Sequence, residues 1–151
     1  MKKNLLVLAV LCIAIVVSCK SLPKFSDAMG KEWKLTDVHI DGKNINFNRQ
    51  TLVEEGFGEI FTLNIDAERF SGIGAPNRYN APYTLGKEQN ISLREPAITL
   101  MAPLRQPEKL KEHDYFTYIK NTHKWNLADN SLELTSKSED GKEVRMVFVA
   151  E

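Results

Sequence analysis

Few side chains in this sequence have the types and the spacing that catalysis or metal binding requires. None of the histidines His39, His113 and His123 has the spacing of a metal ligand. Glu112 and Asp114 flank His113, but consecutive helix residues point in different directions and do not easily share one ion. No G-x-S-x-G elbow and no phosphate-binding glycine loop occurs. We therefore predict a protein that is not an enzyme and that needs neither a metal nor a cofactor.

The side chains best suited to recognition surround Asn77. An asparagine tolerates a turn and can bind nearby backbone through its amide. Tyr79 and Tyr83 stand four positions apart, so they share one face of a strand and are expected to place their hydroxyls at its rim. This arrangement suits either a structural turn or the mouth of a ligand site, and the structural role is favoured.

Glu112 is a charged residue that the sequence places on an apolar helix face. The residues that follow it at i+3, i+4 and i+7 are Tyr115, Phe116 and Ile119. A buried carboxylate needs a partner, because desolvation penalises its charge. Arg78 is the first candidate, and backbone N–H groups of the turn near Asn77 are the second. If the helix register were shifted by one residue, Glu112 would instead reach water at the edge.

Length and composition limit the number of domains and the class of protein. A chain of 151 residues allows one domain and an end segment. Its 42% hydrophobic and 26% charged residues are typical of a folded globule and exclude disorder and multi-span membrane classes. Its 20 basic side chains equal its 20 acidic ones, so no nucleic-acid partner is expected.

The apolar pattern beyond residue 30 predicts short strands and one helix. Alternation marks strands near residues 33–40, 61–65, 69–72, 79–85, 90–93, 124–127, 131–135 and 142–149, with a slip within the first. Residues 42–58 remain ambiguous. Pro107 and Glu108 suit a helix start, so we expect the helix at about residues 108–121. The fold class is α+β: a single domain with a strongly curved antiparallel β-sheet or cracked β-barrel and one packed α-helix.

The first residues predict export. After Lys2 and Lys3, an apolar run of 13 residues at positions 5–17 matches a signal-peptide core and is shorter than the roughly 20 residues that span a bilayer. The next motif resembles the lipobox of bacterial lipoproteins: Val16, Val17, Ser18 and Cys19. We predict a lipoprotein signal peptide at residues 1–18, lipidation at Cys19 and a tether at residues 19–29. A plain signal peptide or a short buried helix is the alternative.

Export would leave a mildly acidic domain with one cysteine. Removing residues 1–18 leaves 18 basic and 20 acidic side chains, so acyl chains rather than a basic patch would hold the protein to the membrane. Cys19 would then have no partner for an internal disulfide. Lipoproteins with aspartate after this cysteine stay in the inner membrane. Lys20 stands there instead, which implies the outer membrane, on its periplasmic or surface side.

Several motifs in order resemble the META/HslJ family. Within residues 70–83, four positions match the spacing of its central motif, G-x-x-G-C-N-x-Y-x-G-x-Y: Gly72, Asn77, Tyr79 and Tyr83. Further matches are the G-x-x-W-x-L start at residues 30–35, the T-L-M-A-P segment at residues 99–103, Glu112 with Phe116, and residues 132–134. The resemblance implies a cracked barrel with one helix at residues 30–151. It carries over no catalytic residue, and some members of the family are linked to heat shock or drug tolerance.

The sequence departs from the family pattern at two cysteine positions. Pro76 and Pro103 replace them, and Ala75 and Ala81 stand where glycines are usual. If the two cysteines form a disulfide in relatives, their joint loss is expected, because one remaining cysteine would be a free thiol in an exported protein. The two prolines are then expected to lie side by side.

These observations favour a lipid-anchored envelope protein whose domain binds or stabilises a partner without catalysis. The family resemblance implies a stress-related role. Three rivals remain open. The first is a carrier of an apolar small molecule in the barrel. The second is a weak enzyme of the envelope, and the third is a pilot lipoprotein for another membrane protein.

Overall fold

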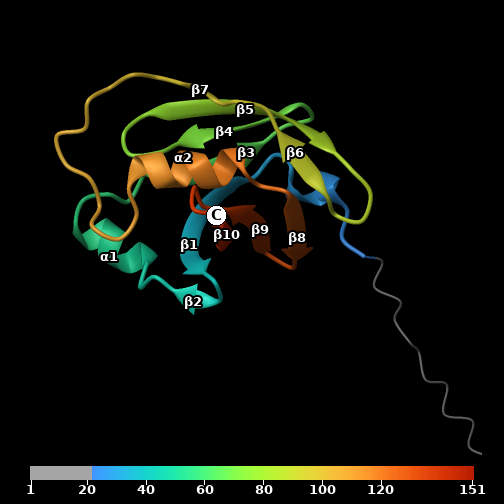
Figure 1. The fold of residues 1–151 in the computed structure, drawn as a ribbon, viewed down its shortest axis with the longest axis horizontal. Coiled ribbons are helices and arrows are strands. Elements are labelled where there is room, and N and C mark those ends of the chain that lie inside the picture. Colours follow the sequence, from blue (N-terminus) through green and yellow to red (C-terminus); the bar gives the residue numbers. More distant parts are fainter. Residues whose placement is uncertain (1–21) are drawn as a thin grey trace, which may run out of the picture.

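In the described residues 22–151 of this computed structural model, ten antiparallel strands form one strongly curved sheet (Figure 1). The strands are β1 (Glu32–Ile40), β2 (Lys43–Asn44), β3 (Thr62–Ile65), β4 (Arg69–Ile73), β5 (Arg78–Leu85), β6 (Ile91–Leu93), β7 (Ala97–Ile98), β8 (Lys124–Ala128), β9 (Ser131–Lys137) and β10 (Glu143–Ala150). Their order is β6-β5-β4-β3-β1-β10-β9-β8, with β2 beside β1 and β7 beside β5. The predicted fold class is confirmed.

Main-chain contacts bring the two edge strands together. Asn90 and Lys124 form an antiparallel bridge. The Ile91 N–H donates to the His123 carbonyl at 3.0 Å, and the Trp125 N–H donates to the Gln89 carbonyl at 3.0 Å. These bonds lie where β6 and β8 begin, so the barrel closes at that point and its edges are protected from pairing with other chains.

Strand β1 contains the slip that its apolar pattern predicted. Its pairing with β10 shifts between Leu35 and Asp37, as in a β-bulge. Because one extra residue enters the strand there, Trp33 and Leu35 before the bulge and Val38 after it are all buried.

Helix α2 (Glu112–Lys120) lies across the curved sheet (Figure 1). Tyr115, Phe116 and Ile119 are buried together with Glu112, so the predicted helix face is confirmed. The helix begins four residues later than expected, because Lys111 has extended backbone at its N-cap. Pro107 and Glu108 therefore precede the helix rather than starting it.

Two short helices occur in segments whose apolar residues show no helical period. The 3-10 helix η1 (Phe25–Ala28) lies within the predicted tether, and α1 (Arg49–Glu54) lies within the ambiguous segment at residues 42–58. Phe25 and Ala28 are buried in the core, and the indole N–H of Trp33 donates to the Ala28 carbonyl at 2.8 Å. The folded domain therefore begins inside the segment expected to be a tether.

Large side chains fill the interior of the barrel. Among those that are almost completely buried are Trp33, Phe61, Phe70, Tyr115, Met146 and Phe148. Within residues 22–151, no helix has the length and apolar character needed to cross a bilayer. The predicted signal peptide and Cys19 lie outside the described residues.

Candidate functional site

The carboxylate of Glu112 is buried in a turn between β4 and β5. Its Oε1 accepts hydrogen bonds from the backbone N–H of Ala75 at 2.5 Å and of Asn77 at 2.6 Å. Its Oε2 accepts a third from the Asn77 side-chain amide at 2.7 Å. Since only 8% of the residue is exposed, these donors replace the water that a carboxylate otherwise binds.

Backbone N–H groups of the turn, the second candidate from the sequence, are thus partners of Glu112. The prediction that Arg78 pairs with Glu112 was wrong. Arg78 is exposed, and its main chain rather than its guanidinium takes part in the local network. The Arg78 N–H donates to the Thr99 hydroxyl at 3.0 Å, and the Thr99 N–H donates to the Arg78 carbonyl at 3.1 Å. A turn with several backbone N–H donors can therefore hold a carboxylate without a cation.

The side chain of Asn77 connects this turn to the loop that follows β7. Its Oδ1 accepts from the Met101 N–H at 2.7 Å and from the Thr99 hydroxyl at 2.9 Å. Its amide group donates to the Met101 carbonyl at 3.0 Å as well as to Glu112. Both backbone groups of Met101 are therefore fixed by one side chain, which confirms the predicted structural use of the asparagine amide.

The backbone at Gly74 approaches α2 so closely that a side chain does not fit. A Cβ placed there would lie 2.5 Å from the ring of Phe116 and 2.9 Å from Oε1 of Glu112. Gly74 also closes the turn, because its N–H donates to the Asn77 carbonyl at 2.6 Å. The requirement for glycine here comes from this close approach of the turn to the helix.

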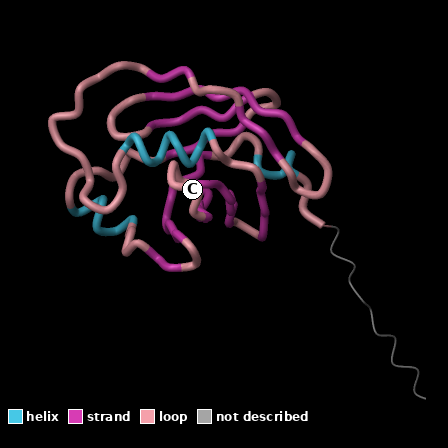
Figure 2. Tube along the Cα trace, viewed as in Figure 1, coloured by secondary structure: helices cyan, strands magenta, loops and turns pink. Residues whose placement is uncertain are grey.

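An apolar pocket of about 360 Å³ lies between this turn and the loop held by Asn77. Figure 2 shows the loop running from β7 past α1 to α2. The pocket is lined by Phe57, Ile60, Ala75, Pro76, Met101, Ala102, Pro103, Leu104 and Arg105. One wall carries a backbone donor to Glu112, and the other is fixed through Met101. We refer to these nine residues as the proline pocket.

Pro76 and Pro103 both line the proline pocket, one from the turn before β5 and one from the loop before α2. Their expected proximity is therefore consistent with the fold, and bridging them by a disulfide stays a prediction that needs a chemical test.

Exposed apolar side chains surround the proline pocket. Leu100 and Leu104 are almost completely exposed, and Met101 is 57% exposed. Arg105 carries the one charge among the lining side chains, and its guanidinium lies over the ring of Phe57, 5.1 Å from the centroid. The pocket therefore offers apolar surface and a cation at its edge.

The candidate residue Tyr79 contacts Tyr115 of α2 in the core. The Tyr79 and Tyr115 hydroxyls donate to the Thr62 carbonyl at 3.1 and 3.0 Å and lie 3.2 Å from each other. Burial raises the pKa of both hydroxyls above the ordinary value of 10.0. The expectation of a hydroxyl at the rim was wrong for Tyr79, because its ring enters the core and its hydroxyl is buried.

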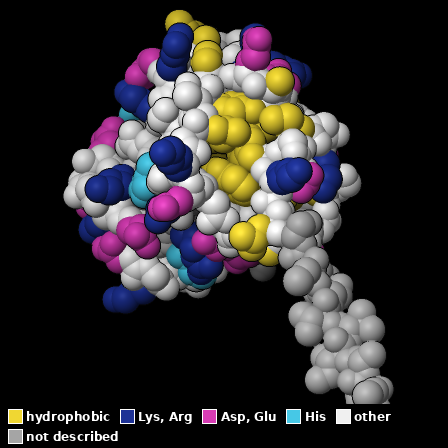
Figure 3. Space-filling view, turned by 90° about the vertical axis from the view of Figure 1, so that its right-hand side faces the viewer, with side chains coloured by type: hydrophobic (Ala, Val, Ile, Leu, Met, Phe, Trp, Pro, Cys, Tyr) yellow, Lys and Arg dark blue, Asp and Glu magenta, His cyan; other side chains and the backbone are white. Residues whose placement is uncertain are grey.

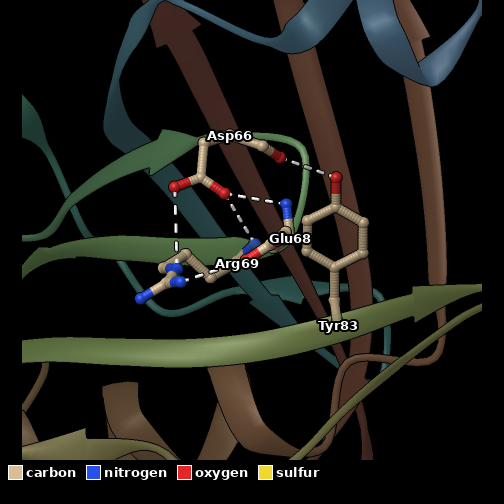
Figure 4. Close-up of polar contacts among 4 residues, drawn as sticks. All are labelled: Asp66, Glu68, Arg69 and Tyr83. Atoms are coloured by element: carbon tan, nitrogen blue, oxygen red, sulfur yellow. Dashed lines mark hydrogen bonds and ion pairs between the residues drawn. The ribbon is translucent and has the colours of Figure 1, made fainter.

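Tyr83 lies on β5 and directs its hydroxyl to the turn between β3 and β4 (Figure 4). Its hydroxyl donates to the Asp66 carbonyl at 2.7 Å. The Asp66 carboxylate accepts from the N–H groups of Glu68 and Arg69, each at 2.8 Å, and these backbone bonds lower the pKa of Asp66. The Tyr83 hydroxyl, expected at the rim, thus binds the turn between β3 and β4. Asn77 and Tyr83 belong to one sequence motif but lie near opposite ends of β5.

Sequence reasoning identified Asn77 and Glu112 but missed the proline pocket. The available signal was a run of apolar residues without periodicity, Leu100, Met101 and Leu104, in a segment bounded by prolines. In the described part of the chain, no group of acidic, histidine or cysteine side chains has the geometry of a metal site.

A family model for the META domain matches residues 26–150. The chain belongs to the META domain family. The sequence resemblance is therefore confirmed over almost the whole of the described META domain. A comparison with curated proteins gave no match.

Two solved structures resemble this META domain. A DUF4847 family protein from Bacteroides vulgatus ATCC 8482 has a TM-score of 0.56 and 15% identity, covering 83% of this chain and 96% of its own. A protein from Burkholderia xenovorans has a TM-score of 0.56 and 20% identity, covering 83% and 85%. At these identities the similarity extends to the fold alone.

Proposed function

We propose that this protein is an exported, lipid-anchored envelope protein whose META domain binds a partner and does not catalyse a reaction. The proline pocket is the binding site. One observation carries the proposal: Glu112 holds one wall of the pocket through a buried hydrogen bond from Ala75, and Asn77 holds the other through Met101, while the apolar lining side chains remain accessible. A site whose walls are already ordered binds with a smaller entropic penalty.

The lining of the pocket suits recognition better than chemistry. Arg105 is its one charged side chain, and an arginine stays protonated and does not serve as a general acid or base near neutral pH. The remaining lining residues supply apolar contact. An apolar ligand, or an apolar side chain of an envelope protein, matches this surface, and an anionic group on either would lie near Arg105.

Anchoring rests on the sequence at the N-terminus. The 13-residue apolar run and the Val16, Val17, Ser18 and Cys19 tetrad support acylation at Cys19, and Lys20 supports placement at the outer membrane. A stress-related role in the envelope follows from the family resemblance.

Two forms of binding fit the pocket. A carrier would hold an apolar small molecule there rather than in the barrel, because core side chains fill the barrel interior. A pilot lipoprotein would bind another membrane protein through the pocket and the exposed leucines beside it. The exposure of Leu100, which does not line the pocket, favours the second form, since a small molecule inside the pocket makes no use of it.

Binding is tested with an apolar fluorescent probe, N-phenyl-1-naphthylamine, titrated into the acylated protein. Ala102→Trp fills the pocket and should abolish probe fluorescence. Ala67→Trp adds the same ring at an exposed turn elsewhere and should bind as the parent does. Equal probe binding by the two variants, or none by the parent, would exclude the pocket as the site.

Native mass spectrometry of protein from its own membrane then separates the two forms. A lipid or other small molecule that the parent retains and Ala102→Trp loses supports the carrier. A protein with the same dependence supports the pilot.

A further inference from the structure

Apolar side chains gather at the end of the barrel where the described chain begins. Tyr83 pairs with Leu93, and Leu85 with Ile91, so all four project from one face of the β5–β6 hairpin. Phe25 of η1 packs edge-on against the ring of Tyr83 at 5.3 Å and against Trp125 at 5.1 Å between centroids. We define Leu22, Phe25, Tyr83, Leu85, Leu93 and Trp125 as the N-terminal face.

Part of the N-terminal face is open to solvent. Leu22 is 87% exposed and Leu85 is 43% exposed, while Tyr83 and Leu93 are half-buried. Figure 3 views the molecule from this side and shows hydrophobic side chains grouped in a hollowed area at the centre of the face. Charges of both signs surround this area, so the face has no single-sign electrostatic character.

The length of the remaining chain determines how far this face lies from the proposed anchor. η1 fixes the chain from Phe25 onward, so the segment between the anchor and the fold is shorter than a tether ending at residue 29. Two residues, Lys20 and Ser21, lie between Cys19 and Leu22, and an extended chain covers at most about 11 Å over these three steps. The polar headgroup layer of one leaflet is roughly 6 Å thick. An acylated Cys19 therefore keeps the exposed side chain of Leu22 within reach of the bilayer.

We infer that the N-terminal face rests on the lipid bilayer and that Leu22 and Leu85 contact it. This inference rests on the proposed acylation of Cys19, which brings the face to the membrane. The exposed leucines then leave water for the interface, which is favourable by the hydrophobic effect. Tyr83, with an apolar ring and a polar hydroxyl, is of the type enriched at that interface.

This orientation directs the proline pocket away from the membrane. Figure 1 shows α1 and the loop before α2 at the end of the molecule opposite to the start of the described chain. Since that loop supplies five of the nine residues that line the pocket, the opening of the pocket is presented to the aqueous envelope. A protein partner can then reach the pocket while the N-terminal face stays on the lipid.

The orientation is measured on the full acylated protein in vesicles of phosphatidylethanolamine and phosphatidylglycerol. Because Cys19 is acylated through its thiol, a second cysteine is the single free thiol of the mature chain. Lys87→Cys lies in the loop after β5, beside Leu85, and Leu104→Cys lies at the proline pocket. Each is labelled with bimane, and quenching by brominated lipid is compared with quenching by aqueous iodide.

We expect brominated lipid to quench the Lys87→Cys label several-fold more than the Leu104→Cys label, and iodide to show the reverse order. Adding Leu85→Glu should reduce lipid quenching at position 87. Val53→Glu, which places the same charge on an exposed apolar site at the far end, should leave it unchanged.

Equal lipid quenching at both labels, or no effect of Leu85→Glu, would overturn the orientation. The mass of the N-terminal peptide separates this failure from that of the proposed function. An acylated protein with equal quenching refutes the orientation alone, whereas a peptide without lipid mass refutes the anchor and, with it, the inference. Far-UV circular dichroism of each variant excludes unfolding as the cause.

Discussion

Replacing Glu112 by alanine removes the acceptor of three buried hydrogen bonds at once. Two of the donors left behind are backbone N–H groups of Ala75 and Asn77, and the third is the Asn77 amide. A hydrogen bond to a charged group contributes about 1.5–3 kcal/mol, and a buried donor left without a partner costs about 1–3 kcal/mol. The three bonds share one carboxylate, so their contributions are not additive. We expect Glu112→Ala to lower the free energy of unfolding by roughly 3–5 kcal/mol.

Urea denaturation followed by tryptophan fluorescence measures this loss. With a slope of about 1–3 kcal/mol per molar urea, the midpoint should fall by roughly 2 M. Glu108→Ala is the matched control, because its side chain is 81% exposed and pairs only with the neighbouring Lys109 among the ion pairs of the described chain. Glu108 lies before α2, so its removal should leave the midpoint of the parent unchanged.

Glu112→Gln tests which part of the carboxylate matters. Its amide oxygen can still accept from both backbone N–H groups, but its NH₂ then faces the NH₂ of Asn77. Asn77 cannot flip in response, because its Oδ1 is held by the Met101 N–H and the Thr99 hydroxyl. The expected midpoint lies between those of the parent and Glu112→Ala. Equal midpoints for Glu112→Ala, Glu108→Ala and the parent would refute the reasoning.

Three further predictions concern other parts of the chain. Cys19→Ala should abolish the lipid mass on the N-terminal peptide, and a variant that is still acylated would exclude Cys19 as the anchor. Pro76→Cys with Pro103→Cys should form a disulfide in air, since a bridge needs Cα atoms within about 7 Å; a folded, persistently reduced double variant would contradict their proximity. Burial raises the pKa of Tyr79 and Tyr115, so stability should hold below pH 10.0 and fall as the pH rises towards the folded-state pKa; an unchanged urea midpoint above pH 10.0 would contradict this.

The strands were predictable because each has one face in the core. Alternation located β3, β5, β9 and β10 and even the bulge in β1, since inward and outward residues differ sharply in hydrophobicity. The apolar positions of α2 were found for the same reason. The start predicted for α2 is wrong because Pro107 and Glu108 have the composition of a first helical turn, whereas Lys111 has an extended backbone and the helix begins after it.

The short helices and the proline pocket depend on contacts that a local pattern does not contain. The pattern predicts a tether over η1 because only Phe25 and Ala28 of that segment are buried, which is too few residues to show a period. The pocket forms where residues 101–105 fold over Pro76, and a loop carries no periodicity that would reveal it. Arg78 was favoured as the partner of Glu112 because side-chain charge is visible in a sequence, whereas the direction of backbone N–H groups is not.

Hydrogen bonds through Asn77 make the pocket depend on α2. The loop before α2 lacks regular structure at Met101, and such segments are mobile unless their backbone groups are bound. Asn77 binds both of those groups, and Glu112 holds Asn77 in the required orientation. Loss of the Glu112 contact should therefore release the loop and weaken pocket binding, even in a variant that stays folded.

Comparing two folded variants isolates this dependence from stability. Glu112→Gln disturbs Asn77 and should weaken binding of N-phenyl-1-naphthylamine. Tyr115→Phe removes a buried hydroxyl that contacts Thr62 and Tyr79, neither of which lines the pocket, so it should lower stability and leave probe affinity unchanged. If both variants lost affinity in proportion to their loss of stability, the pocket would depend on the fold as a whole. A loss confined to Glu112→Gln would assign the order of the loop to the contact between Asn77 and Glu112.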